Sequence, residues 1–130
     1  PVAAARAGAM ILVQDFAMMK RMLPVWVAHY LDLIDAGRIV IDDIGYLCSH
    51  YSSHSLREEV IVLLKQAGAM IDERRWFSNL YSKGNTGAAS IFIMLEELYR
   101  AGNLQRGEKI LCHVPESGRC LHGFMLLEVV

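Results

Sequence analysis

Apolar residues recur at helical spacing in the first part of the chain, from Met10 to about Ala36. A repeat of this kind predicts a helix that buries one face. Pro24 lies inside the stretch and either starts a second helix or kinks the first. Gly37 follows the last apolar positions and is expected to end the helix in a left-handed cap. We therefore expect a helical N-terminal region over about residues 10–36.

Short apolar runs alternate with longer amphipathic runs in the remainder of the chain. The runs typical of strands are 46–48, 76–81, 109–114 and 123–130. Helices are expected between them, at about 53–66 and 88–101. Ser55 and Glu58 have the spacing of a capping box, so the first of these helices is expected to begin at Ser53 or Ser55. The alternation predicts an α/β fold: a mixed, mostly parallel sheet covered on both faces, whose last two strands are antiparallel.

Length and composition indicate one domain with its own core, since the chain has 130 residues and 54% of them are apolar. That apolar fraction is above the usual range, so we expect part of it to cover a face that meets another domain. The formal net charge of -1 gives no electrostatic argument for nucleic acid or an anionic membrane as a partner. The uninterrupted apolar runs are too short for a membrane span.

The cysteines Cys48, Cys112 and Cys120 are odd in number and have no paired spacing. This pattern argues against a disulfide framework and for a reducing compartment, so we expect a cytoplasmic protein. The residues from Pro1 onward lack the apolar segment and cleavage site of a signal peptide. We interpret the chain as a piece of a longer protein.

Polar residues follow the expected strands at the points where ligands collect in α/β folds. His50 comes just after the first strand, and Asn85 lies in the glycine-rich segment Gly84–Gly87 after the second. The third strand leads to Gly118. A histidine, an asparagine and a glycine turn at one sheet edge could hydrogen-bond a carbonyl oxygen, and the histidine could change protonation near neutral pH.

Three strings carry a resemblance to a known family: GNTGAAS before an apolar helix, LQRGEKILC, and the terminal HGFMLLEVV. Together they resemble the C-terminal half of a β-ketoacyl-acyl carrier protein synthase III, a condensing enzyme of the thiolase superfamily. The resemblance covers about residues 38–130, and Gly84–Ser90 differs from the family string only at Gly87. It implies a three-layer α/β/α half-thiolase fold, with residues 1–130 as a C-terminal domain whose catalytic-cysteine half lies outside this chain.

The resemblance implies catalytic roles for two side chains. His50 matches the catalytic histidine of the family and Asn85 its catalytic asparagine. In the family this pair hydrogen-bonds the thioester carbonyl of the malonyl donor and stabilises the enolate left when carbon dioxide departs. Both side chains carry N–H donors, as that task requires. Gly118 falls where the family's glycine turn offers a backbone N–H to the acyl-thioester oxygen.

Two positions depart from the family pattern and are expected to bind substrate. Ser53 stands where the family has an asparagine, which changes the polar support beside His50. Arg119 stands in the glycine turn, where it could narrow or charge an acyl pocket. The nucleophilic cysteine of the family belongs to the N-terminal half, and none of the three cysteines here occupies a matching position. The chain alone is therefore expected to be inactive.

The implied partners are an acyl carrier protein, acyl and malonyl thioesters, and the N-terminal half of the same enzyme, in a homodimeric parent. No cofactor and no metal are expected. Three other interpretations stay open. Gly84–Gly87 at a helix start could bind a small anion, and the chain could belong to a non-catalytic subunit that keeps the fold for pairing. A metal site at Cys48, His50 and His54 would need three or four convergent ligands.

Overall fold

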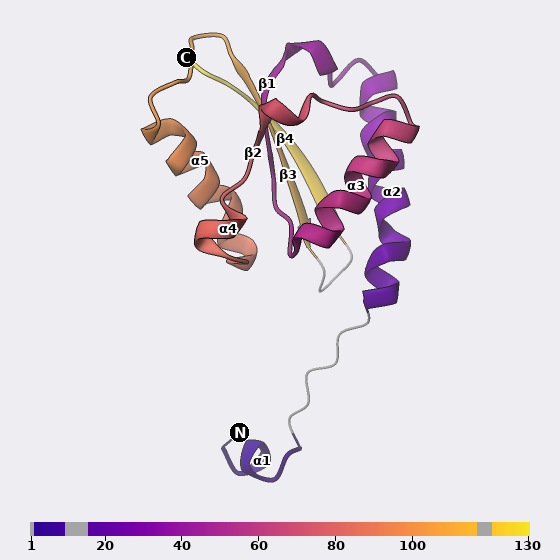
Figure 1. Ribbon diagram of the computed structural model, residues 1–130, viewed down its shortest axis with the longest axis vertical. Helices are drawn as coiled ribbons and strands as arrows, with labels where there is room; N and C mark the ends of the chain where they lie inside the picture. Colours follow the sequence, from indigo (N-terminus) through magenta and orange to yellow (C-terminus); the bar gives the residue numbers. More distant parts are fainter. Residues whose placement is uncertain (1, 10–15, 117–120) are drawn as a thin grey trace.

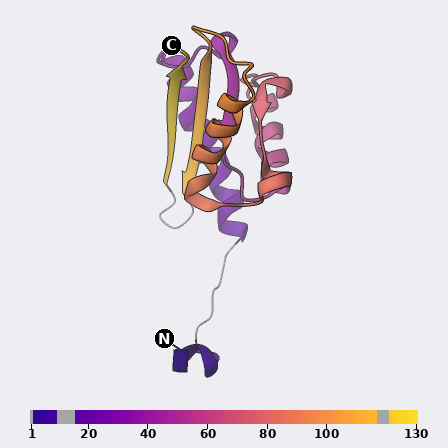
Figure 2. The same ribbon diagram turned by 90° about the vertical axis from the view of Figure 1, so that its left-hand side faces the viewer.

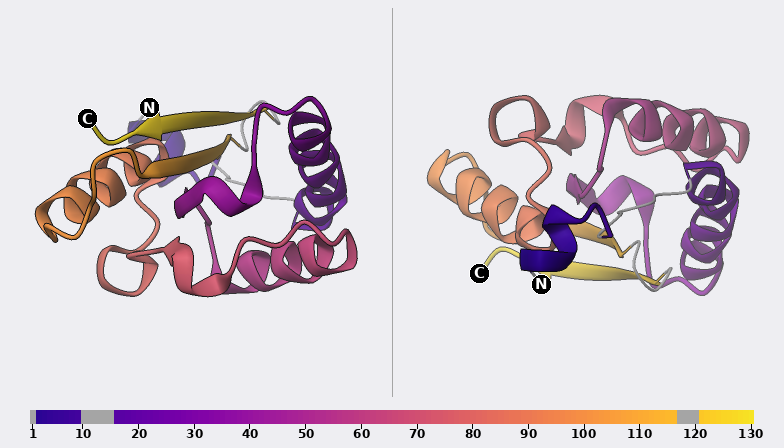
Figure 3. Two further views of the ribbon diagram at one scale, coloured as in Figure 1. Left: turned by 90° about the horizontal axis from the view of Figure 1, so that it is seen from above. Right: turned by 90° about the horizontal axis from the view of Figure 1, so that it is seen from below.

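The computed structural model describes residues 2–9, 16–116 and 121–130, and it shows three layers (Figure 1). Helices α2 (Phe16–Asp35) and α3 (His54–Gln66) cover one face of a sheet, and α5 (Ser90–Arg100) covers the other. Views from above and below show the strands between these two sets of helices (Figure 3). The expected α/β architecture with helices on both faces is confirmed.

The sheet has four strands in the order β2-β1-β3-β4. Their bounds are β1 (Ile44–Ser49), β2 (Trp76–Phe77), β3 (Lys109–Glu116) and β4 (Leu121–Glu128). β1 pairs in parallel with β2 and β3, whereas β4 runs antiparallel to β3 and lies beside it along its length (Figure 2). This is the mixed, mostly parallel sheet that the alternation of elements predicted.

Short elements complete the chain: α1 (Val2–Arg6), α4 (Leu80–Lys83), and the 3₁₀ turns η1 (Ile41–Asp43), η2 (Glu73–Arg75) and η3 (Gly87–Ala89). None of the helices within the described ranges is both long and apolar enough to cross a bilayer.

The expected helical region is confirmed for residues 16–35, where α2 runs through Pro24 as one helix. Residues 10–15 of the expected region lie outside the described residues. Gly37 ends α2 as expected, with a φ of 68° and hydrogen bonds from Gly37 N to Ile34 O and from Arg38 N to Leu33 O. These bonds satisfy carbonyl groups that the helix itself leaves unpaired.

The expected strand at 76–81 is wrong beyond Phe77, because Leu80–Lys83 form the helix α4. Polar side chains explain the change. Ser78 Oγ accepts a hydrogen bond from Leu80 N at 3.4 Å, and Ser82 Oγ donates to Asn79 O at 3.1 Å. Such local bonds compete with a strand ladder and favour a turn or a helix start.

Alternation along the strands builds two cores on the two faces of the sheet. Leu47 and Leu111 are buried with residues of α2 and α3, whereas Cys48 and Cys112 are buried with residues of α5. Leu111, Cys48 and Cys112 are fully buried. Because each strand contributes to both cores, the carboxyl ends of β1 and β3 are held rigidly beside each other.

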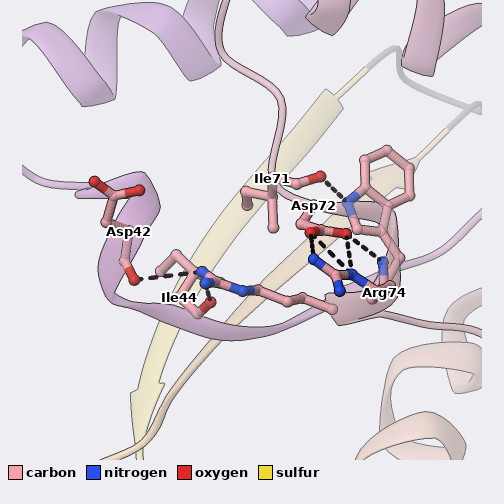
Figure 4. Close-up of polar contacts among 7 residues, drawn as sticks. Asp42, Ile44, Ile71, Asp72 and Arg74 are labelled. Atoms are coloured by element: carbon pink, nitrogen blue, oxygen red, sulfur yellow. Dashed lines mark hydrogen bonds and ion pairs between the residues drawn. The ribbon is translucent and has the colours of Figure 1, made fainter.

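Arg75 ties η2 to the start of β1 through the main-chain oxygens of Asp42 and Ile44, two residues labelled in Figure 4. Its guanidinium donates to the main-chain oxygens of Asp42 at 3.3 Å and Ile44 at 3.0 Å. Trp76 Nε1 donates to Ile71 O at 2.9 Å in the same region. These bonds place the short strand β2 next to β1, and through it the segment that leads to Asn85.

Candidate functional site

His50 is the first residue after β1, at the carboxyl edge of the sheet. Its main-chain N–H donates to His113 O at 3.0 Å, which extends the parallel pairing of β1 and β3 by one residue. The side chain is half-buried, and this burial lowers the pKa of His50 below its ordinary value. A neutral imidazole, with one N–H donor, is therefore favoured near neutral pH.

Asn85 lies in the segment between α4 and η3. Its Oδ1 accepts a hydrogen bond from Gly87 N at 2.9 Å. The main-chain donor identifies the oxygen end of the amide, so the amide nitrogen Nδ2 is the end left for another partner. Within the part of the chain that the structure describes, Nδ2 has no hydrogen-bond partner. The loop thus holds Asn85 as a hydrogen-bond donor.

His50 and Asn85 line one cavity of about 250 Å³. The cavity lies where the carboxyl ends of β1 and β3, the helices α2 and α3 and the Asn85 segment meet. Its remaining described walls are mainly apolar, formed by Met19, Leu23, Trp26, Tyr51, Ser52, Leu56, Val60, Gly87, Ala88, His113, Val114 and Pro115. A mainly apolar wall with a few polar groups is typical of a small-molecule site.

His113 adds a second imidazole to the wall of this cavity. Its Nδ1 lies 3.0 Å from Ser49 Oγ, and its ring stacks on Phe124 at a centroid distance of 4.6 Å. Burial, followed by nearby His122, His50 and His29, lowers the pKa of His113 to about 3. The side chain is therefore neutral at physiological pH.

The other predicted site residues are placed differently. Ser53 is the N-cap of α3, with its Oγ accepting from Leu56 N at 3.3 Å. This also corrects the expected capping box at Ser55 and Glu58, because the helix begins at His54. Ser53 is not among the described residues that line the cavity, whereas its neighbour Ser52 is. Gly118 and Arg119 lie outside the described residues.

Cys48 and Cys112 stand opposite each other in the β1–β3 register, and both are free thiols. Burial raises the pKa of Cys48 to about 12 and that of Cys112 to about 11. A thiol with a raised pKa holds little thiolate and is a poor nucleophile. Both lie within strands, away from any helix N-terminus. Cys120 lies outside the described residues.

The structure bears on two of the open alternatives. No group of three histidine, cysteine, aspartate or glutamate side chains that could hold a metal is found among residues 2–9, 16–116 and 121–130. His54 stacks on Tyr81 at a centroid distance of 4.0 Å, and Cys48 packs in the core under α5. In the Gly84–Gly87 segment, Asn85 Oδ1 already occupies Gly87 N–H, which an anion would otherwise use.

Sequence reasoning missed the contributions of Trp26 and His113 to the cavity. The helical spacing of Trp26 predicted a core residue, and the side chain is in fact buried, with 7% of its surface exposed. The signal for His113 was its position: it is the last polar residue of the expected strand 109–114, and this strand pairs with the one before His50. Two neutral donors, from His50 and Asn85, on an apolar wall can stabilise an oxygen on which negative charge develops.

Comparisons with known proteins agree with this reading of the fold. Curated β-ketoacyl-[acyl-carrier-protein] synthase III from Clostridium kluyveri is 26% identical over 114 residues, covering 88% of this chain and 33% of the relative. The protein of the same name from Clostridium beijerinckii is 32% identical over 90 residues, covering 69% of this chain and 26% of the relative. The chain therefore spans about a third of the length of the curated relatives it matches.

Solved structures show the same fold. β-Ketoacyl-[acyl-carrier-protein] synthase III from Thermus thermophilus superimposes with a TM-score of 0.73 at 19% identity, over 91% of this chain and 35% of that one. The OleA protein of Xanthomonas campestris gives a TM-score of 0.70 at 22% identity, over 88% and 31%.

A family model matches residues 34–119, which is most of the chain and includes both His50 and Asn85. The model describes the C-terminal region of 3-oxoacyl-[acyl-carrier-protein] synthase III. The chain belongs to this family and has the half-thiolase fold of its relatives.

Proposed function

We propose that this chain is the C-terminal part of an enzyme that condenses an acyl thioester with malonyl-acyl carrier protein in fatty acid or polyketide-type biosynthesis. One observation carries the proposal. His50 and Asn85 come from separate segments of the chain, and they line one cavity at the carboxyl edge of the sheet. Family membership supports the same activity.

The reaction requires that negative charge be held on an oxygen. When the malonyl thioester loses carbon dioxide, the electron pair of the broken C–C bond moves to the neighbouring carbon and its thioester carbonyl, which becomes an enolate. His50 and Asn85 donate hydrogen bonds to that oxygen. The enolate carbon then attacks the acyl carbon held as a thioester on a cysteine, forming the new C–C bond and releasing the thiolate.

The neutral state of His50 suits this role. A neutral imidazole donates one N–H to the enolate oxygen and does not have to lose a proton first. The apolar cavity wall strengthens the interaction because it lowers the local dielectric constant. Gly87 N–H donates a hydrogen bond to Oδ1 of Asn85. Because this oxygen is occupied, the amide nitrogen Nδ2 is the end that faces the enolate oxygen as a donor.

The cysteine that carries the acyl group is assigned to the N-terminal half of the enzyme. The high pKa of Cys48 and of Cys112, which burial causes, supports this assignment. We assign the contact with that half to the outer face of α5, where Phe92 and Tyr99 are 70% and 76% exposed. These two aromatic side chains are seven residues apart and so lie on one side of the helix.

Further parts of the proposal follow from the family. Gly118 offers its backbone N–H to the acyl-thioester oxygen, and Ser53 and Arg119 bind substrate. The substrate arrives on an acyl carrier protein, the parent enzyme is a homodimer, and it works in the cytoplasm without a cofactor or metal. The free thiols Cys48 and Cys112 support a reducing compartment.

The test uses the complete enzyme that carries this chain and measures two steps separately. In His50→Ala and in Asn85→Ala, acylation of the cysteine should be largely intact. Release of carbon dioxide from the malonyl thioester should fall about 10²-fold to 10³-fold, which is typical for one lost oxyanion donor. Normal carbon dioxide release in both variants would overturn the mechanism and favour a non-catalytic subunit that keeps the fold for pairing.

A further inference from the structure

The carboxylate of Glu97 on α5 joins the two ends of α4. Its Oε2 accepts a hydrogen bond from Asn79 Nδ2 at 2.6 Å, and its Oε1 forms an ion pair with Lys83 Nζ at 3.2 Å. Asn79 is the residue before α4, and Lys83 is the last residue of α4. Each oxygen of one carboxylate therefore fixes one end of this short helix to α5.

The segment that α4 leads into carries Asn85. Gly84 follows α4 directly, and Thr86 Oγ1 lies 2.8 Å from the Oγ of Ser90, the first residue of α5. The segment is thus attached to α5 on both sides of Asn85, by Glu97 before it and by Ser90 after it. Ser90 is 5% exposed, so that attachment point is buried at the start of α5.

The ionised state of Glu97 strengthens its contacts with Asn79 and Lys83. The hydrogen bond from Asn79, followed by the hydrogen bond and the charge of Lys83, keeps the pKa of Glu97 below its ordinary value. The group is ionised at neutral pH, and hydrogen bonds to an ionised acceptor are stronger than those between neutral groups. A four-residue helix has too few internal bonds to hold itself in place, since isolated short helices are unstable.

We propose that Glu97 is a positioning residue of the condensing site: by clamping both ends of α4 onto α5, it sets the position of the Asn85 amide at the cavity that His50 also lines. This inference rests on the proposed function of Asn85 as an oxyanion donor. Donor position matters greatly in such a site, because a displacement of about 1 Å can cost roughly 10²-fold in rate. Glu97 is not among the described residues that line the cavity, so it acts through Asn85.

Three variants of the complete enzyme separate this role from general stability. Glu97→Ala removes both attachments, Glu97→Gln keeps an acceptor for Asn79 but loses the charge, and Glu96→Gln is the matched control. Glu96 pairs with Arg100 on α5 itself, at i,i+4, and this pair does not involve α4. Carbon dioxide release should fall about 10-fold to 100-fold in kcat for Glu97→Ala and less for Glu97→Gln, with KM little changed, whereas Glu96→Gln should match the wild type.

A double-variant comparison distinguishes positioning from an independent effect. If Glu97 acts only through Asn85, then Glu97→Ala should add no further loss to Asn85→Ala. Multiplying losses would overturn the proposal, as would unchanged carbon dioxide release in Glu97→Ala alone. If Glu97→Ala fails to fold, Lys83→Met replaces it in the same comparison. This variant removes only the ion pair between Lys83 and Glu97.

A measurement that does not depend on enzyme activity distinguishes this inference from the proposed function. Hydrogen exchange of Gly87 N–H reports the bond to Asn85 Oδ1 directly. Exchange at Gly87 should accelerate at least several-fold in Glu97→Ala and stay as in the wild type in Glu96→Gln. An unchanged Gly87 rate would overturn the clamp even if Asn85 proves catalytic. A faster rate with no effect of Asn85→Ala on carbon dioxide release would keep the clamp and reject the proposed function.

Discussion

The main-chain N–H of His50 donates to the carbonyl oxygen of His113 across a distance of 3.0 Å. This bond joins the ends of β1 and β3 and brings two imidazoles to the wall of one cavity. A hydrogen bond in the sheet ladder cannot shift without breaking the register of both strands. The backbone of His50 is therefore placed by the sheet, whereas Asn85 depends on a loop.

Asn85→Asp tests the donor role of the Asn85 amide separately from its role in the loop. Aspartate keeps an oxygen for Gly87 N–H but has no N–H to donate and adds a negative charge. Carbon dioxide release should fall about 10²-fold or more, while the free energy of unfolding stays near that of the wild type. Asn85→Ala should lose both activity and about 1 kcal/mol of stability. Wild-type carbon dioxide release in Asn85→Asp would show that Nδ2 is not a catalytic donor.

His113 should make the fold sensitive to acid. Its pKa is lowered to about 3 in the folded chain by burial, against about 6.5 when unfolded. Between these values the unfolded state binds the extra proton, so stability is complete above about pH 6.5 and decreases as the pH falls toward 3. The contribution is about 1.4 kcal/mol per pH unit.

Urea unfolding of wild type and His113→Phe between pH 7.5 and pH 4.5 measures this dependence. Phenylalanine preserves a ring against Phe124, and it should reduce the slope by about one proton. His122 and His50 also have a pKa lowered by burial, so a smaller slope of the same sign should remain. Equal slopes for the two proteins would contradict the lowered pKa of His113.

Gly84 adopts a backbone conformation that other residues avoid, with φ of 70° and ψ of −167°. Gly84→Ala should therefore destabilise the fold by about 1–3 kcal/mol, and it should also slow carbon dioxide release because Asn85 is the next residue. Gly123→Ala in β4 is the matched control, since a Cβ there meets open space and the φ is not positive. Thermal unfolding checks both. Equal stability of the two variants would contradict the conformation described for Gly84.

Ser53 is predicted to bind substrate, and in the structure it caps α3. Ser53→Ala should reduce the free energy of unfolding by about 1 kcal/mol, whereas Ser53→Asp should retain it because aspartate is also a good N-cap. Chemical unfolding measures this part. The Asp variant then isolates the predicted substrate binding: we expect KM to rise, because a carboxylate replaces the hydroxyl that is predicted to contact the substrate. An unchanged KM would show that Ser53 caps α3 and does not bind substrate.

The chain alone should be inactive in condensation and should self-associate. Phe92 and Tyr99 are large aromatic side chains exposed on one side of α5, and exposed apolar side chains that lie together favour association. Phe92→Gln with Tyr99→Gln should shift the 130-residue chain toward monomer in sedimentation experiments. Val62→Gln on α3 is the control, since Val62 is also exposed, at 53%, but lies on the opposite helical layer. A wild-type chain that stays monomeric at high concentration would contradict the predicted surface.

The sequence by itself determined most of the elements and the residues with the right chemistry. Helical spacing predicted α2, α3 and α5, and alternation of elements predicted the mostly parallel sheet. The string at Gly84–Ser90 led to Asn85, and the position just after a strand led to His50. Both residues line one cavity, and their catalytic roles stay predictions. The predictions of helices and strands succeed because spacing, caps and glycine positions depend on near neighbours in the chain.

Only the tertiary structure decided what lies next to what. It turned residues 80–83 into a helix, and Glu97 of α5 holds this helix through Asn79 before it and Lys83 at its end. It assigned Ser53 to a cap and brought Trp26 and His113 to the cavity. The physical reason is that such contacts depend on strand register and on helix packing across the sheet. No short segment of the sequence encodes these contacts, since side chains far apart in the chain meet only when the whole domain is packed.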